Sequence, residues 1–291
     1  MTQKYSLLAV VGILLVSCLG QDAPTGPSFE EQLKKDIVAI DAFLATNAIS
    51  VLKDSSGTRY AVTKIGTGAK PVANGIAYVS VKGKIMSTGS VFADSKDAFV
   101  KITLSNPLLP CWQIVLPKIN KGSSVTIYSP SGLAYGTGGS SDGSVAANTN
   151  VIFDLKLFDE VEQFKTDTTA IETYLATNNI TTAITDPSGL RYVVTVLGTG
   201  VKPTATSTIT FNYDGKFLTT GTSFDKSSAP ATSALSGLIK GFQIGMPLLP
   251  AGTKATFYIP SSLGYGPTID SSGKIPGNSN LIFDVELVST N

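Results

Sequence analysis

The chain contains no histidine, and this absence excludes several common kinds of active site. Imidazole is the side chain that most often moves protons near neutral pH, and it is a frequent metal ligand. Catalysis by histidine and histidine-based metal centres are therefore excluded. The stretch from Leu238 to Phe283 also lacks a carboxylate cluster. We therefore expect a site that works without a metal ion or a cofactor.

An excess of charge of either sign is also absent. The chain has 22 lysines and arginines against 21 aspartates and glutamates, which leaves a formal net charge of +1. An extended nucleic-acid surface needs a basic excess, so we expect no nucleic-acid partner. Apolar residues make up 42% of the 291 residues, which is enough for packed cores and suggests about two domains.

Cysteine is rare as well, with two in the whole chain. Cys18 ends the sequence Leu-Val-Ser-Cys after an apolar run, which resembles the lipobox of bacterial lipoproteins. We predict a signal peptide over residues 1–17, lipidation of Cys18 that holds the protein on a membrane, and a polar tether over residues 18–27. The alternative is an ordinary signal peptide with a chance cysteine. Cys111 is expected to be a small buried residue.

The rest of the chain contains an internal repeat, because several short segments recur after roughly 130 residues. The recurring segments are 43–47 and 174–178, 56–60 and 188–192, 66–68 and 198–200, 133–136 and 263–266, and 150–155 and 280–285. This period is much longer than that of solenoid repeats, so it indicates a duplicated domain. We place the first domain at 28–160 and the second at 161–291.

Each half is predicted to begin with an amphipathic helix. Ser28 and Glu31 have the spacing of a capping box, and apolar residues then recur at helical spacing until Asn47. The corresponding face in the second half comprises Val161, Phe164, Ile171 and Leu175. Strands rich in β-branched and aromatic residues are predicted at 192–197, 208–213, 254–259 and 281–287, with a short helix within 234–242. A helix laid on such strands indicates an α+β fold with one covered sheet face.

Several motifs of the second half occur in the order found in one known family. They are Phe224-Asp225, Ile239-Lys240-Gly241-Phe242, Gly252-Thr253-Lys254, Ile259-Pro260 followed by Tyr265-Gly266, and Ile275-Pro276 followed by Leu281–Leu287. Residues 193–288 resemble the FKBP family of peptidyl-prolyl cis–trans isomerases, and residues 61–161 resemble it less completely. The resemblance implies a bent antiparallel sheet wrapped on a short helix in each half.

The same resemblance implies a set of site residues. The substrate-binding residues would be Tyr213, Phe224, Phe242, Ile275 and Phe283, with Phe242 as the floor where the family usually has tryptophan. The catalytic residues would be Ile239 through its backbone N–H, Tyr265 through its hydroxyl, and Asp225 facing the reacting bond. Without the resemblance, the aromatic residues are as well explained by an ordinary core. The segment 230–233 lacks an aromatic residue that the family often has, and Asp270 and Lys274 replace more apolar residues.

The first half has lost several of these features. Val81 stands at the tyrosine position, and Phe92 is followed by Ala93, so the aspartate is missing or displaced to Asp94. The Ile-x-Gly-aromatic motif has become Leu109-Pro110-Cys111-Trp112, and Val145 replaces the closing isoleucine. We therefore expect the first half to keep the fold with a weak or absent site.

Three functions remain open at this point. The resemblance favours a peptidyl-prolyl isomerase that acts through the second half on proline-containing peptides or unfolded exported proteins. The alternatives are a non-catalytic chaperone or protein-binding lipoprotein with the same fold, and a scaffold lipoprotein with vestigial sites. In each case the lipid at Cys18 predicts a place in the cell envelope, with the bacterial outer membrane expected and the membrane face left open.

Overall fold

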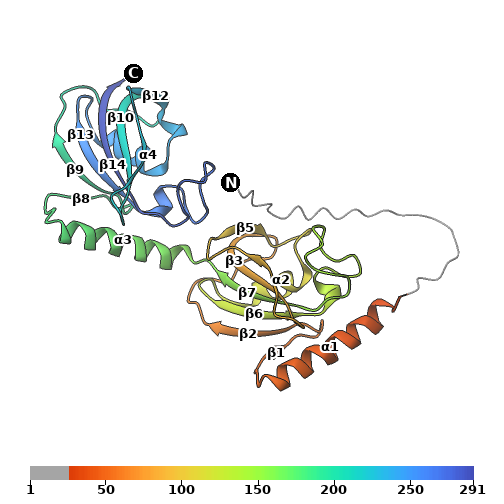
Figure 1. The fold of residues 1–291 in the computed structure, drawn as a ribbon. Helices are drawn as coiled ribbons and strands as arrows, with labels where there is room; N and C mark the ends of the chain where they lie inside the picture. Colours follow the sequence, from red (N-terminus) through yellow and green to blue (C-terminus); the bar gives the residue numbers. More distant parts are fainter. Residues whose placement is uncertain (1–25) are drawn as a thin grey trace, which may run out of the picture. The chain divides into compact units, whose positions relative to one another are not determined.

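The computed structural model describes residues 26–291, so Cys18 and the predicted signal peptide lie outside the described residues. The chain divides between Asp159 and Glu160 into two compact units (Figure 1). Each unit consists of a leading helix, a seven-stranded antiparallel sheet and a short helix. The predicted α+β fold with a duplicated architecture is confirmed. No helix within residues 26–291 is both long enough and apolar enough to cross a bilayer.

The first unit begins with its leading helix and then forms the sheet. Its elements are α1 (Phe29–Thr46), β1 (Leu52–Lys53), β2 (Arg59–Lys64), β3 (Ile76–Ile85), β4 (Val91–Asp94), β5 (Val100–Thr103), α2 (Pro110–Val115), η1 (Leu116–Lys118), β6 (Ser124–Ser129), η2 (Ser131–Leu133) and β7 (Val151–Leu157). The strand order is β1-β2-β6-β7-β3-β4, and β5 also pairs with β3.

The second unit repeats this plan element by element. Its elements are α3 (Glu160–Thr177), β8 (Ile184–Thr185), β9 (Arg191–Val196), β10 (Thr208–Phe217), β11 (Ser223–Lys226), β12 (Ala231–Ala234), η3 (Leu235–Gly237), α4 (Lys240–Gly245), η4 (Met246–Leu248), β13 (Lys254–Ile259), η5 (Ser261–Leu263) and β14 (Leu281–Thr290). The strand order β11-β10-β14-β13-β9-β8, with β12 on β10, matches that of the first unit.

The leading helices bury a narrow apolar face against one side of each sheet. The predicted cap of α1 is present: the Ser28 hydroxyl accepts the Glu31 N–H at 3.3 Å, and the Glu31 carboxylate accepts the Ser28 N–H at 2.9 Å. In α3, Ile171 and Leu175 are buried in a cluster with residues of the sheet. The prediction for Val161 is wrong, because this side chain in the first turn is 77% exposed and lies outside that cluster.

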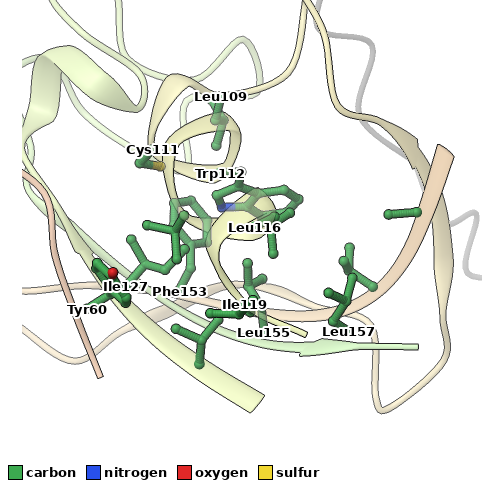
Figure 2. Packing of buried hydrophobic residues seen from close by; sticks show 14 of the residues in the cluster. Tyr60, Leu109, Cys111, Trp112, Leu116, Ile119, Ile127, Phe153, Leu155 and Leu157 are labelled. Carbon is green, nitrogen blue, oxygen red and sulfur yellow. The ribbon is translucent and has the colours of Figure 1, made fainter. Parts of the chain in front are cut away.

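The other face of each sheet packs against the short helix. In the first unit, α2 and η1 place Trp112, Val115 and Leu116 on Ile127 and Phe153, and Figure 2 shows side chains of this cluster gathered around Trp112. In the second unit the equivalent residues from α4 and η4 pack on β13 and β14. The side chains of the short helix therefore cover the centre of the sheet in each unit.

Paired differences in side-chain size keep both interiors filled. Gly245 in α4 faces the fully buried ring of Phe257, and a Cβ at Gly245 would lie 2.7 Å from the ring carbon Cζ. At the equivalent positions of the first unit, Val115 and Ile127 are both fully buried. One unit thus combines a very small residue with a large one, and the other combines two of middle size. The two combinations are alternative ways to fill the space between the short helix and the sheet, as close-packed interiors require.

Candidate active site

Four aromatic rings of the second unit meet at one end of the sheet. Phe283 on β14 is the centre: its ring centroid lies 4.9 Å from that of Phe242, 5.6 Å from that of Phe224 and 6.3 Å from that of Tyr213. The first two contacts are edge-to-face, a favourable arrangement for aromatic quadrupoles. Phe242 and Phe283 are buried, whereas Tyr213 and Phe224 are partly exposed at the rim of the core.

A glycine in β10 allows two of these rings to approach the backbone. A Cβ on Gly215 would lie 2.6 Å from the Phe283 ring and 2.7 Å from the Phe224 ring. Real Cβ atoms do not come this close to other carbon atoms, so any larger residue would push the rings apart. Gly83 has the same relation to Phe92 in the first unit, at 2.6 Å.

A hydrogen-bonded pair of polar side chains lies beside the aromatic rings. The Tyr213 hydroxyl donates to Oδ2 of Asp225, an exposed residue of β11, at 2.8 Å. Burial, together with this bond to a carboxylate, raises the pKa of Tyr213 to about 12. The phenol therefore stays protonated at neutral pH and holds the carboxylate in one orientation next to the rings.

The two other predicted catalytic residues, Tyr265 and Ile239, lie in the segments next to η5 and α4. Tyr265 follows η5 and is 40% exposed; burial of its hydroxyl and the negative charges of Asp270 and Asp225 raise its pKa. Ile239 connects η3 to α4 in an extended conformation, with ψ of 152°. Within residues 26–291, no hydrogen bond uses the Ile239 N–H as donor. The short helix expected within 234–242 is present as α4, which begins at Lys240 and runs on to Gly245, and the extended Ile239 separates it from η3.

Ile275 is buried beneath the loop that follows Tyr265, with 3% of its surface exposed. Its N–H donates to Oδ1 of Asp270 at 2.7 Å, and its carbonyl accepts the Asp270 N–H at 3.0 Å. Asp270 therefore joins the two ends of the segment 270–275 through these two hydrogen bonds. This role is not predictable from the sequence, where Asp270 stands in place of a more apolar residue of the family.

The first unit lacks the polar pair. Val81 and Ala93 occupy the positions of Tyr213 and Asp225, so both members of the pair are missing. Asp94 does not replace the aspartate, because it is the next residue along β4 and pairs with Lys82 across the strands at 3.6 Å. Adjacent residues of a strand point to opposite faces.

Tyrosine also packs differently in the first unit. Tyr135, the counterpart of Tyr265, makes an edge-to-face contact with Phe92 at 5.7 Å and packs against the core. Among the ring contacts of residues 26–291, none involves Tyr265. Trp112 keeps its indole Nε1 buried without a hydrogen-bond partner, and burial raises the pKa of the Cys111 thiol to about 12. The buried thiol is typical of a packed interior, and the prediction that Cys111 is buried is confirmed.

A separate groove of about 460 Å³ lies on the opposite side of the second sheet. Its charged side chains are paired with one another: Lys254 lies 3.4 Å from Glu286, and Lys226 lies 3.8 Å from Asp214 across β10 and β11. Charges that neutralise one another leave little to recognise a ligand, so the aromatic cluster is the stronger candidate. Residues 26–291 hold no group of three or more cysteine, aspartate or glutamate side chains placed to bind a metal ion.

Comparison with known proteins identifies the family. The FKBP-type peptidyl-prolyl cis-trans isomerase family matches twice, at residues 68–158 and 199–288, together more than half of the chain. The FKBP-type isomerase FkpA of Aeromonas hydrophila is 40% identical over 147 residues, which cover 47% of this chain and 53% of that relative. The outer membrane protein MIP of Legionella longbeachae is 40% identical over 106 residues, 35% of this chain and 45% of that protein.

A crystal structure of FkpA from Escherichia coli covers 45% of this chain and 64% of its own, with 30% identity and a TM-score of 0.38. The chain spans about half the length of the curated relatives it matches. The two family matches fall one in each unit, and each contains that unit's short helix and all or most of the two central strands of its sheet. The chain therefore belongs to the FKBP-type peptidyl-prolyl cis-trans isomerase family.

Proposed function

We propose that this protein is a peptidyl-prolyl cis–trans isomerase whose second unit carries the activity. The observation that supports this most directly is the meeting of Phe224, Phe242 and Phe283 beside the hydrogen-bonded pair of Tyr213 and Asp225. Apolar rings suit a proline side chain, and a few fixed polar groups suit the peptide on either side of it. No proton has to be moved in this reaction.

The reaction is a rotation about a bond with partial double-bond character. Amide resonance sets a barrier of about 18–20 kcal/mol, and an enzyme lowers it by binding the twisted amide better than either planar form. The twisted amide has lost the charge separation of resonance, so an apolar surface favours it over the planar state. In this proposal the proline ring rests on Phe242, the free N–H of Ile239 and the Tyr265 hydroxyl hold substrate carbonyls, and Asp225 faces the rotating bond.

The first unit has a different role in this proposal. It lacks the tyrosine–aspartate pair, and its Tyr135 packs on Phe92. A tyrosine held against the core does not project toward a substrate. We therefore assign turnover to the second unit and regard the first as a non-catalytic module of the same fold.

The cellular setting follows from the leader and from the substrate class. Lipid on Cys18 would hold both units at the cell envelope, with the bacterial outer membrane as the expected site. Proline-containing segments of unfolded exported proteins would be the substrates, since proline isomerisation takes tens to hundreds of seconds without a catalyst. Mass spectrometry of the mature protein tests the anchor: an acylated N-terminal Cys18 is expected, and an unmodified cysteine would contradict it.

The decisive experiment is a protease-coupled assay on a proline-containing peptide. We expect wild-type protein to accelerate isomerisation, Asp225→Ala to lower kcat/KM about 10-fold, and Tyr265→Phe to lower it about 3- to 10-fold, the effect of losing one net hydrogen bond. The matched control is Tyr135→Phe in the first unit, which should leave kcat/KM unchanged. A wild-type rate at background, with aggregation of an unfolded client still suppressed, would replace the isomerase by a non-catalytic chaperone.

The activity should not depend on pH near neutrality. Histidine is absent, and the pKa of Tyr213 is raised to about 12. We expect constant kcat/KM from about pH 7 to about pH 9, because no tyrosine of the site ionises there. The stability that the protonated Tyr213 provides is complete below its ordinary pKa of about 10 and is lost as the pH rises above that value.

The measurement is a denaturant midpoint for the second unit at increasing alkaline pH. Tyr213→Phe cannot ionise at this position and is the control: it should lose less stability than wild type at high pH. A sharp fall of kcat/KM between about pH 7 and about pH 8 would contradict the proposed site, because it would require an essential group with a pKa near neutrality.

A further inference from the structure

A buried carboxylate of the leading helix reaches the loop that carries Tyr265. Asp167 on α3 is 1% exposed, and its Oδ2 accepts two hydrogen bonds from Ser261 in η5: from the N–H at 3.0 Å and from the hydroxyl at 2.5 Å. Its Oδ1 accepts a bond from Nε2 of Gln163 at 2.7 Å. A buried charge is tolerated only when such donors surround it. Asp167 is not one of the candidate site residues described above, so the presence of a buried carboxylate at this position needs another explanation.

Ser261 is connected to Tyr265 by the backbone of a tight loop. The Ser261 carbonyl accepts the N–H of Gly264 at 3.0 Å and the N–H of Gly266 at 2.9 Å. These glycines are the two neighbours of Tyr265 in the chain, so the tyrosine is held on both sides by one carbonyl group. The Ser261 N–H is also shared with Oδ1 of Asn280 at 3.1 Å. Fixing Ser261 therefore fixes the segment from which the Tyr265 side chain extends.

The first unit contains the same arrangement. Oδ2 of Asp36 on α1 accepts the Ser131 N–H at 2.8 Å and the Ser131 hydroxyl at 2.6 Å, and its Oδ1 accepts Nε2 of Gln32 at 2.7 Å. Asp36 is 3% exposed. The first unit thus offers a matched copy of the network next to a tyrosine that packs on the core. A comparison of the same substitution in the two units therefore distinguishes an effect on the attachment of the leading helix from an effect on the candidate site.

We propose that Asp167 is a positioning residue for Tyr265, which makes the leading helix α3 a working part of the active site. The proposal rests on the proposed function, because it assigns the Tyr265 hydroxyl a bond to the substrate. A hydroxyl on a loop anchored through Ser261 is already oriented before the peptide arrives. Removing the anchor leaves the tyrosine in place but lets its loop move, so less of its hydrogen bond is realised in the transition state.

The test is a double-mutant cycle on the full mature chain. We expect Asp167→Ala to lower kcat/KM about 10-fold in the wild-type background, but less than about twofold when Tyr265 is already phenylalanine. Asp167→Asn should restore most of the activity, since its carbonyl oxygen still accepts both bonds from Ser261. Ser261→Ala, a milder change, should show the same dependence on Tyr265. The matched control Asp36→Ala should not change kcat/KM.

Two outcomes would overturn this inference. One is an equal loss of kcat/KM for Asp167→Ala in both backgrounds, which would indicate a general loss of native structure. The other is a folded Asp167→Ala protein with full activity. A second readout does not require activity: hydrogen-exchange protection of the Gly266 amide should fall in Asp167→Ala and stay unchanged in Tyr265→Phe. If wild-type protein proves inactive while this protection falls, the proposed function fails and the positioning role remains.

Discussion

Phe283→Ala is expected to abolish measurable isomerase activity and to lower the free energy of unfolding of the second unit by about 3–5 kcal/mol. Phe283 is 4% exposed and makes ring contacts with Tyr213, Phe224 and Phe242. Its removal leaves a cavity at the centre of the cluster, and the three neighbouring rings then have no common surface to hold them. The surface proposed to bind proline would lose its shape along with its stability.

The first unit supplies the control for this prediction. Phe153 occupies the equivalent position and contacts Trp112 at 5.2 Å. Trp112 is the single tryptophan of the chain, so its fluorescence reports unfolding of the first unit alone. Phe153→Ala should shift that unfolding transition to lower denaturant while kcat/KM stays unchanged. Full activity of folded Phe283→Ala would contradict the proposed site.

Gly245→Val is the second large effect that we expect. The new side chain would meet the Phe257 ring, which is fully buried, from a Cβ position 2.7 Å from Cζ. Overpacking of a filled core costs about 1–3 kcal/mol. We expect a loss near the upper end of this range, because the ring lies between α4 and the sheet and has no exposed side toward which to move.

A compensating substitution distinguishes this explanation from a general helix defect. Combining Gly245→Val with Phe257→Ile reproduces the pairing of Val115 with Ile127 in the first unit. We expect the double variant to recover most of the lost stability, although each single variant is destabilised, one by overpacking and the other by a cavity. Chemical denaturation followed by circular dichroism measures all three. Additive losses in the double variant would refute the size complementarity.

Features that depend on neighbouring residues were predicted well from the sequence. The capping box of α1 forms as expected, and β13 covers the predicted residues, Lys254–Ile259. These signals are local, because a cap needs two residues three apart and a strand needs alternation over a few residues. The duplication and the family motifs were also readable, and they led to the right fold.

Features that depend on distant partners were missed. The carboxylate of Asp167 accepts a hydrogen bond from Ser261, which lies 94 residues further along the chain. In the sequence, Asp167 resembles an ordinary polar residue of a helix. Strand β10 extends to Phe217 because β14 pairs with it there. Within the candidate site, the motifs named the residues, but the bond from Tyr213 to Asp225 and the fastening of Ile275 by Asp270 required coordinates.

The cross-strand ion pairs at the edges of the two sheets have opposite polarity. In the first unit Lys82 on β3 stands opposite Asp94 on β4, and in the second Asp214 on β10 stands opposite Lys226 on β11. Two tandem copies of one fold are prone to trade edge strands while they fold. If β4 and β11 were exchanged, Lys82 would stand opposite Lys226 in one sheet, and Asp214 would stand opposite Asp94 in the other. Like charges directly opposite each other are unfavourable. The reversed polarity therefore favours pairing of each edge strand with the sheet of its own unit over pairing with the sheet of the other unit.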